Sequence, residues 1–149
     1  MPDIAFKNIM GIMNNKIKIS ICGDTCSECP RYIATIENDT NRLVELAQLW
    51  YRLGFRDRVV EPDEIRCVGC DKTKACSYGI NTCPHLEGKD NCGQCDVFPC
   101  EKIINIFEKT DDLNERCKRL CPPHEYLQLQ KAFLMKRETL YHINEQLHK

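Results

Sequence analysis

The sequence predicts an α-rich α+β fold, in which helices surround a small cysteine-rich, metal-stabilised loop region with at most a short β-sheet. Helical periodicity dominates both flanks, one period-2 segment opens the first flank, and the stretch between them holds seven of the twelve cysteines with little apolar periodicity. A chain of 149 residues can bury a core of its own. We therefore expect a single domain over 1–149, with a strand and helices in 16–60, a metal-binding insert in 61–100 and helices in 101–149.

The first flank begins with an alternating segment. Residues 16–22 place isoleucines on one face and polar residues on the other, which is the pattern of a half-buried strand. This strand leads into a turn at Cys22 and Gly23. Pro30 suits the first position of a helix, because the amide there needs no partner. Residues 30–37 therefore predict a short helix.

A stronger helix is predicted after a break at residues 38–40. Apolar residues recur at helical spacing through residues 41–54. Trp50 lies on this apolar face, so we expect it in the core. Gly54 is suited to end the helix, since glycine readily adopts the left-handed conformation that follows many helices.

The second flank begins after Cys100 with a broad apolar helical face. Asp111 or Asp112 is suited to cap a second, short helix that ends at Leu120. The sequence therefore predicts two helices between residues 101 and 120.

A long C-terminal helix is predicted over residues 123–148, after a restart at Pro122 and Pro123. Its apolar stripe is interrupted once, by Lys136. The stripe suits packing on the helix's own domain, and it also suits a seam with a partner protein or a second copy of the chain. We expect a protein partner or a homodimer through this helix.

Charge and hydropathy exclude several classes of function. The chain has 21 basic and 22 acidic side chains, and residues 61–100 carry seven acids against four bases. Nucleic-acid binding requires the opposite balance. No apolar stretch suits a signal peptide or a membrane span. We therefore expect a cytoplasmic protein without a membrane or nucleic-acid partner, in a compartment where clustered cysteines bind metal or do redox chemistry.

Cysteine spacing is the most specific signal in the chain. Two cysteines separated by two residues can direct both sulfurs at one ion from a tight turn, and glycine at position 69 or 93 suits such a turn. The pairs Cys67/Cys70 and Cys92/Cys95 are 21 residues apart, close to a familiar zinc pattern, which favours a site that joins them. The predicted metal ligands are Cys22, Cys26, Cys29, Cys67, Cys70, Cys76, Cys83, Cys92, Cys95 and Cys100.

A second site is predicted in which some of Cys22, Cys26 and Cys29 join some of Cys76, Cys83 and Cys100. Crossed arrangements of the cysteines are equally allowed by the spacing. Two sites give about two zinc ions per chain. An iron–sulfur or thiol redox protein is the alternative, because thiolates suit both metals. His85 is a candidate to replace a thiolate. Cys117 and Cys121 share a helix face near His124, but we interpret them as bystanders.

The segments CGDTCSECPRYIAT, IRCVGC and NCGQCDVFPCEKI resemble an uncharacterised, cysteine-rich family of bacterial and archaeal proteins classed as a domain of unknown function. The resemblance spans about residues 18–108. It implies a cytosolic metal-binding domain, with zinc as the expected metal, and no known reaction. Cys76 lies in a region of variable length in the family, so its ligand role is less well defined. Cys117, Cys121 and the C-terminal helix lie outside the shared pattern.

No catalytic motif stands out in the sequence. Within it we find no serine–histidine–aspartate set, phosphate-binding glycine loop, zinc-protease motif or carboxylate pair. We therefore assign no catalytic residues and no organic cofactor. The expected function is that of a zinc-binding protein with structural cysteine-ligated sites, which serves as an interaction module.

Overall fold

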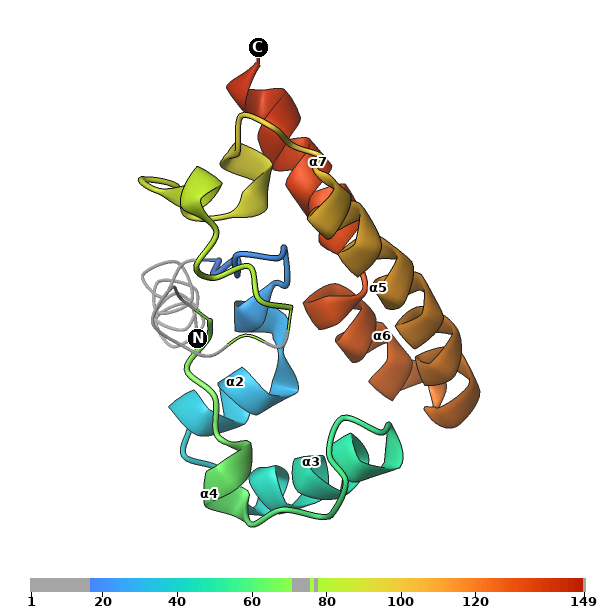
Figure 1. Cartoon of the computed structure of the whole chain (residues 1–149). Coiled ribbons are helices and arrows are strands. Elements are labelled where there is room, and N and C mark those ends of the chain that lie inside the picture. Colours follow the sequence, from blue (N-terminus) through green and yellow to red (C-terminus); the bar gives the residue numbers. More distant parts are fainter. Residues whose placement is uncertain (1–16, 71–75, 77, 149) are drawn as a thin grey trace, which may run out of the picture.

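The structure, a computed structural model, describes residues 17–70, 76 and 78–148 (Figure 1). The described chain is mainly α-helical, and none of its helices is both long and apolar enough to cross a membrane. The α-helices are α2 (Pro30–Ile36), α3 (Thr40–Arg52), α4 (Pro62–Ile65), α5 (Glu101–Leu120), α6 (Pro123–Phe133) and α7 (Lys136–Leu147). Three short 3-10 turns are η1 (Cys26–Glu28), η2 (Pro84–Leu86) and η3 (Cys92–Gln94).

The expected N-terminal strand does not form within the described residues. Ile19 and Thr25 make an isolated antiparallel bridge, and no sheet accompanies it there. The alternation also does not separate inside from outside, because Ser20 is buried whereas Ile17 is 77% exposed. Lys16, at which the strand was expected to begin, lies outside the described residues, as do residues 71–75 of the expected insert.

The predicted helices of the first flank are confirmed as α2 and α3. Asp39 caps α3, since its side chain accepts a hydrogen bond of 3.1 Å from the Arg42 amide. Helix α3 ends at Arg52, and Gly54 follows its C-cap Leu53 with a φ of +83°, in the stop position expected from the sequence. The Gly54 amide donates to the Tyr51 carbonyl at 3.0 Å and the Phe55 amide to the Trp50 carbonyl at 2.8 Å, so the last carbonyls of α3 are satisfied.

The predicted break near Asp111 is wrong, because α5 is continuous from Glu101 to Leu120. The Thr110 hydroxyl donates a hydrogen bond of 2.8 Å to the Ile106 carbonyl of the same helix. Asp111 pairs with Arg137 of α7 instead of capping a new helix. Asp111 therefore serves a surface contact between helices α5 and α7.

The single long C-terminal helix is also wrong, because it is divided into α6 and α7 at Leu134 and Met135. Lys136 opens α7 and is only 2% exposed, and its ammonium donates to the Phe133 carbonyl at 2.9 Å. This lysine is the interruption in the apolar stripe. The break allows the two halves of the stripe to face different neighbours.

The buried side chains form two hydrophobic clusters, which we call the first core and the second core. The first core joins α2, α3, α4 and α6 around Trp50, which is buried as expected. The second core joins the cysteine-rich loops with the beginning of α5 and with Leu140 of α7. Figure 1 shows α5 extending along both regions, with α7 beside its beginning and α6 beside its end.

Candidate metal centres

Four cysteines from two distant segments meet beside α2, and we call them the first set: Cys26, Cys29, Cys67 and Cys70. Cys26 begins η1 and Cys29 is its C-cap, so one tight turn carries both sulfurs. The second segment follows α4. Its Gly69 has a φ of +95°, as the sequence predicts for a turn between two ligands.

Helix α2 fastens this second segment to the first. The Arg31 guanidinium donates hydrogen bonds to the carbonyl oxygens of Ile65 and Arg66, the latter at 3.2 Å. The Thr35 hydroxyl accepts a hydrogen bond of 2.9 Å from the Cys67 amide. Two polar side chains of one helix therefore fix the approach of the chain to Cys67.

Lys18 closes the arrangement from the other side. Its amide donates to the Ser27 hydroxyl at 3.1 Å, and its carbonyl accepts from the Cys26 amide at 2.7 Å. Its ammonium reaches the Val68 carbonyl at 2.9 Å, and its aliphatic chain lies over Gly69, where a Cβ atom would come within 2.5 Å of it.

Cys26 and Cys70 are in direct contact. Their thiols form a hydrogen bond, and the Cys70 amide also donates to the Cys26 sulfur. The thiol–thiol hydrogen bond, together with burial, raises the pKa of Cys26 above its ordinary value. A bound cation would reverse this preference, because a metal ion replaces the protons of its thiol ligands.

Backbone amides also point at the other two buried or half-buried sulfurs of the first set. Burial raises the pKa of Cys29 to about 11, while the amides of Tyr32 and Arg31 donate to its sulfur and oppose that rise. The Gly69 amide donates to the Cys67 sulfur at 3.4 Å. Cys67 is an electrostatic neighbour of Cys29. These amides are arranged to stabilise negative charge on sulfur.

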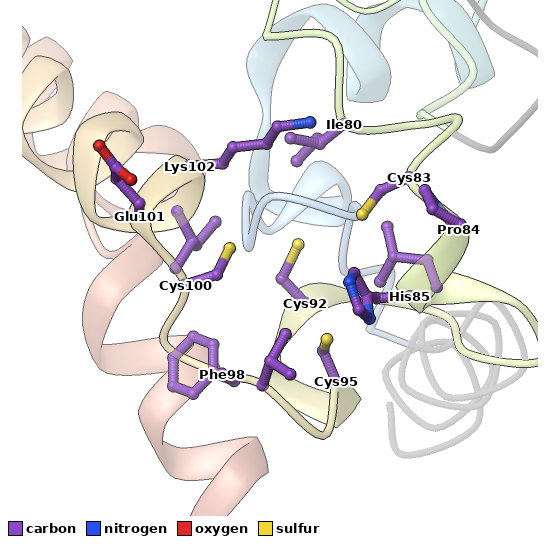
Figure 2. A pocket seen from close by; sticks show the side chains of 13 residues that line it. Ile80, Cys83, Pro84, His85, Cys92, Cys95, Phe98, Cys100, Glu101 and Lys102 are labelled. Carbon is purple, nitrogen blue, oxygen red and sulfur yellow. The ribbon is translucent and has the colours of Figure 1, made fainter.

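The second set of cysteines surrounds a cavity of about 360 Å³ against the second core. It comprises Cys83, Cys92, Cys95 and Cys100, which come from the η2 entry, from η3 and from the cap of α5. Figure 2 shows their sulfur atoms facing the space between these segments, with the His85 ring at its side.

Cys92 is central to this second set. Burial is the largest effect on its thiol, and the neighbouring thiols of Cys100, Cys22, Cys95 and Cys83 add to it, so the pKa of Cys92 rises to about 12. Five cysteines therefore gather in one weakly hydrated region. Burial disfavours the thiolates of Cys92 and Cys22 until a cation compensates their charge.

Helix α7 holds the η3 turn in place. The Asn144 amide group donates to the Gly93 carbonyl at 3.1 Å, and the Cys92 amide donates to the Ile21 carbonyl at 2.9 Å. A Cβ atom at Gly93 would lie 2.8 Å from the Leu140 carbonyl oxygen. Gly93 is thus needed for close approach to α7 rather than for a positive φ.

The loop from Cys22 to Cys26 connects the two sets and is anchored to the α6–α7 junction. The Thr25 amide donates to the Ala132 carbonyl at 2.9 Å. Asp24 forms a buried ion pair with Lys136. Burial disfavours the charged ammonium of Lys136. The charges of Asp24, Cys22 and Tyr78 nevertheless hold the pKa of Lys136 above its ordinary value.

Cys22 itself lies between the ion pair and Cys92. Its sulfur is 3.3 Å from the Ser20 hydroxyl, and burial followed by the charge of Asp24 raises its pKa to about 12. Cys76 is half-buried at the edge of the second core, beside Tyr78. Neither cysteine lines the cavity.

The structure groups the cysteines differently from the grouping that their spacing in the sequence favours. Cys67 and Cys70 meet the first segment, whereas Cys92 and Cys95 meet Cys83 and Cys100. Across the described residues, no three histidine, cysteine or acidic side chains are close enough around one point to hold a metal ion as they stand. Nor does any of the twelve cysteines, all of which are described, form a disulfide.

The other candidates lie apart from these sets or at their edge. Cys117 is buried in the first core at the end of α5, where its thiol contacts that of Cys121. His124 is exposed at the start of α6. His85 is exposed and lines the cavity of the second set.

Sequence reasoning missed the side chains that position the loops. Sequence patterns assigned no role at the cysteine loops to Arg31, Lys18 or Lys136, yet each one fastens a cysteine-bearing segment. Lys136 alone left a signal, since it interrupts an apolar stripe. Arg31 and Lys18 act on carbonyl groups roughly 35 and 50 residues away, which a local pattern does not indicate.

Comparison with known proteins gives one match. Residues 18–105, more than half of the chain, match the family described as "Protein of unknown function (DUF3795)". This range contains both sets of cysteines and agrees with the resemblance found in the motifs. No curated protein and no solved structure matches the chain.

Proposed function

We propose that this chain, which belongs to the DUF3795 family of proteins of unknown function, is a metal-binding protein whose first set of cysteines holds a structural zinc ion. Zinc accepts four thiolates from paired turns of this kind. The bound ion would join the segment of residues 67–70 to η1. It would thereby order a loop region that has few apolar side chains of its own.

The observation that supports zinc at the first set is the group of amides directed at its sulfurs. Cys26, Cys29 and Cys67 each accept a backbone N–H. Hydrogen bonds of this kind favour the thiolate over the thiol, and thiolate is the form that binds zinc. Buried neutral thiols acting only as small apolar groups would not need several donors aimed at them.

A structural role is the best interpretation of this set. Structural zinc sites use four protein ligands, whereas catalytic sites keep a position for water or substrate. Four cysteines would complete the coordination of zinc. Binding of this type contributes on the order of 10 kcal/mol to folding, enough to order the loops. The cytoplasm expected from the sequence would keep the thiols reduced for the metal.

Metal counting on purified protein tests the proposal. The full chain should carry zinc, and Cys70→Ser should lose one zinc ion per chain, because one ligand of the first set is removed. Cobalt substitution provides a second measurement, since the thiolate-to-cobalt absorption reports the number of sulfur ligands. The intensity should correspond to four thiolates at the first set.

Cys121→Ser is the matched control, because it removes a half-buried cysteine that belongs to neither set. Its zinc content should equal that of the unsubstituted chain. The assignment is refuted if Cys70→Ser retains the full zinc content while the folded signal by circular dichroism is unchanged.

An interaction role for the whole chain is a further part of this proposal, and its support is the exposed apolar side chains on the last helix. Tyr141 and Leu147 of α7 are 39% and 57% exposed. We expect a protein partner or a second copy to bind this helix. Light scattering at increasing concentration tests the homodimer, and Leu147→Lys should weaken it.

A further inference from the structure

The cavity of the second set differs in kind from the first site. Its volume is about 360 Å³, and four cysteines face it from three separate segments. In the first set, by contrast, two sulfurs already touch. The second set therefore surrounds a space rather than a point.

A single zinc ion does not account for such a space. Zinc lies about 2.3 Å from each thiolate, so four ligands of one ion pack against one another. An iron–sulfur cluster has several iron and sulfide atoms at its centre and carries its cysteine ligands on the outside. Four cysteines around a cavity are the arrangement that this larger group requires.

The walls of the cavity also suit a cluster. Ile80, Leu86 and Ile103 line the cavity and are at most 3% exposed, and the half-buried Phe98 also lines it. Apolar walls restrict water, and restricted water protects a cluster and sets its potential. The Lys102 side chain lies at the edge (Figure 2), where its positive charge would offset the negative charge of a thiolate cluster.

We infer that Cys83, Cys92, Cys95 and Cys100 hold an iron–sulfur cluster in this cavity. The inference extends the proposed function, since it assigns a second metal group to the same protein, but it does not depend on zinc at the first set. Cys22 is an electrostatic neighbour of Cys92, but it is not one of the ligands, because it does not line the cavity.

The test uses the full chain, purified without oxygen and incubated with iron and sulfide. We expect a brown protein with a broad visible absorption that bleaches in air, and with iron and acid-labile sulfide in equal amounts. Cys95→Ser should lose most of the iron and sulfide but keep the zinc of the first set. Cys22→Ser should keep the iron and sulfide.

Cys70→Ser separates this inference from the proposed function. It should lose zinc while retaining iron and sulfide, so either assignment can fail alone. A colourless chain that takes up a second zinc ion and no sulfide would overturn the cluster. So would an organic molecule released from the cavity on denaturation, or equal iron and sulfide in Cys95→Ser and the unsubstituted chain. The measurement on the unsubstituted chain decides the matter even if a variant fails to fold.

Discussion

At the scale of single residues, the buried ion pair between Lys136 and Asp24 determines how the loop between the two sets is held. An ammonium that is 2% exposed requires a partner, and Asp24 is that partner. The pair connects the start of α7 to the residues between Cys22 and Cys26. Its removal should therefore affect the loop and the helix together.

Lys136→Met should lower the free energy of unfolding by about 3–5 kcal/mol, because it leaves the Asp24 carboxylate buried without its partner. Urea unfolding measures the change. Lys131→Met is the matched control, since Lys131 is exposed on α6. Adding Asp24→Asn to Lys136→Met removes the unpaired charge and should restore part of the loss. A Lys136→Met protein as stable as the control would show that the pair does not hold the loop.

The exposed pair between Asp111 and Arg137 gives a pH-dependent contribution of modest size. Arg137 donates two hydrogen bonds, at 3.0 and 3.2 Å, and these lower the pKa of Asp111. A lowered pKa in the folded state stabilises the protein above the unfolded value near 3.9. The stabilisation is lost as the pH falls through the folded value.

Asp111→Asn should therefore cost less than about 1 kcal/mol at pH 7, since exposed pairs are screened by solvent. The difference in unfolding free energy between the two proteins should vanish once the pH is well below 3.9. Urea unfolding across this pH range measures it. A difference that persists at low pH would mean that the carboxylate charge is not its source.

At the scale of helices and turns, the sequence predicted what depends on local pattern. Pro30, the break before Asp39 and the stop at Gly54 are visible in a short window, and α2 and α3 form as expected. At the break inside the last helix, Lys136 is buried and paired with a distant residue, Asp24. Local pattern therefore predicted one helix where tertiary contacts produce two.

The same limit applies to the cysteine pairs. Spacing grouped Cys67 and Cys70 with the next pair along the chain, because short separations are the familiar zinc pattern. The structure instead brings Cys70 to Cys26, 44 positions earlier, through contacts of α2 and Lys18. Hydrogen bonds to distant carbonyl groups leave no periodic signal, so sequence identified the cysteines but not their grouping.

The cap of α3 provides a test at this scale. Asp39→Ala removes the side chain that accepts from the Arg42 amide, and it should cost about 1 kcal/mol of unfolding free energy. Asp39→Asn keeps an accepting oxygen and should be nearly neutral. Thermal unfolding followed by circular dichroism measures both. Equal losses in the two variants would contradict a capping role.

At the scale of the whole molecule, two cores share one long helix. The beginning of α5 contributes Ile103, Ile106 and Phe107 to the second core, and its end contributes Cys117 to the first. Among the described residues of the insert between the flanks, only Ile65, Ile80 and Leu86 are fully buried aliphatic residues. The insert therefore has the least apolar burial to hold it.

Metal removal should show that the insert is less stable than the helices of the two flanks. A chelator should first abolish amide-hydrogen protection in the described part of residues 61–100, while α3 and α5 retain theirs, because local stability follows buried apolar contact. Hydrogen exchange with mass spectrometry measures the sequence of events. Cys70→Ser without chelator should reproduce the loss near the first set. Simultaneous loss over all helices would show that the metal supports the entire fold.

The loop from Cys22 to Cys26 has a consequence for the order in which the two centres fill. One end of this loop neighbours Cys92 and the other end contacts Cys70. An occupant that fixes the loop at one end reduces the conformational freedom that must be lost at the other. Loading of the two centres should therefore be cooperative. The factor by which an occupant of the first set raises the affinity of the second set must equal the factor by which an occupant of the second set raises the affinity of the first.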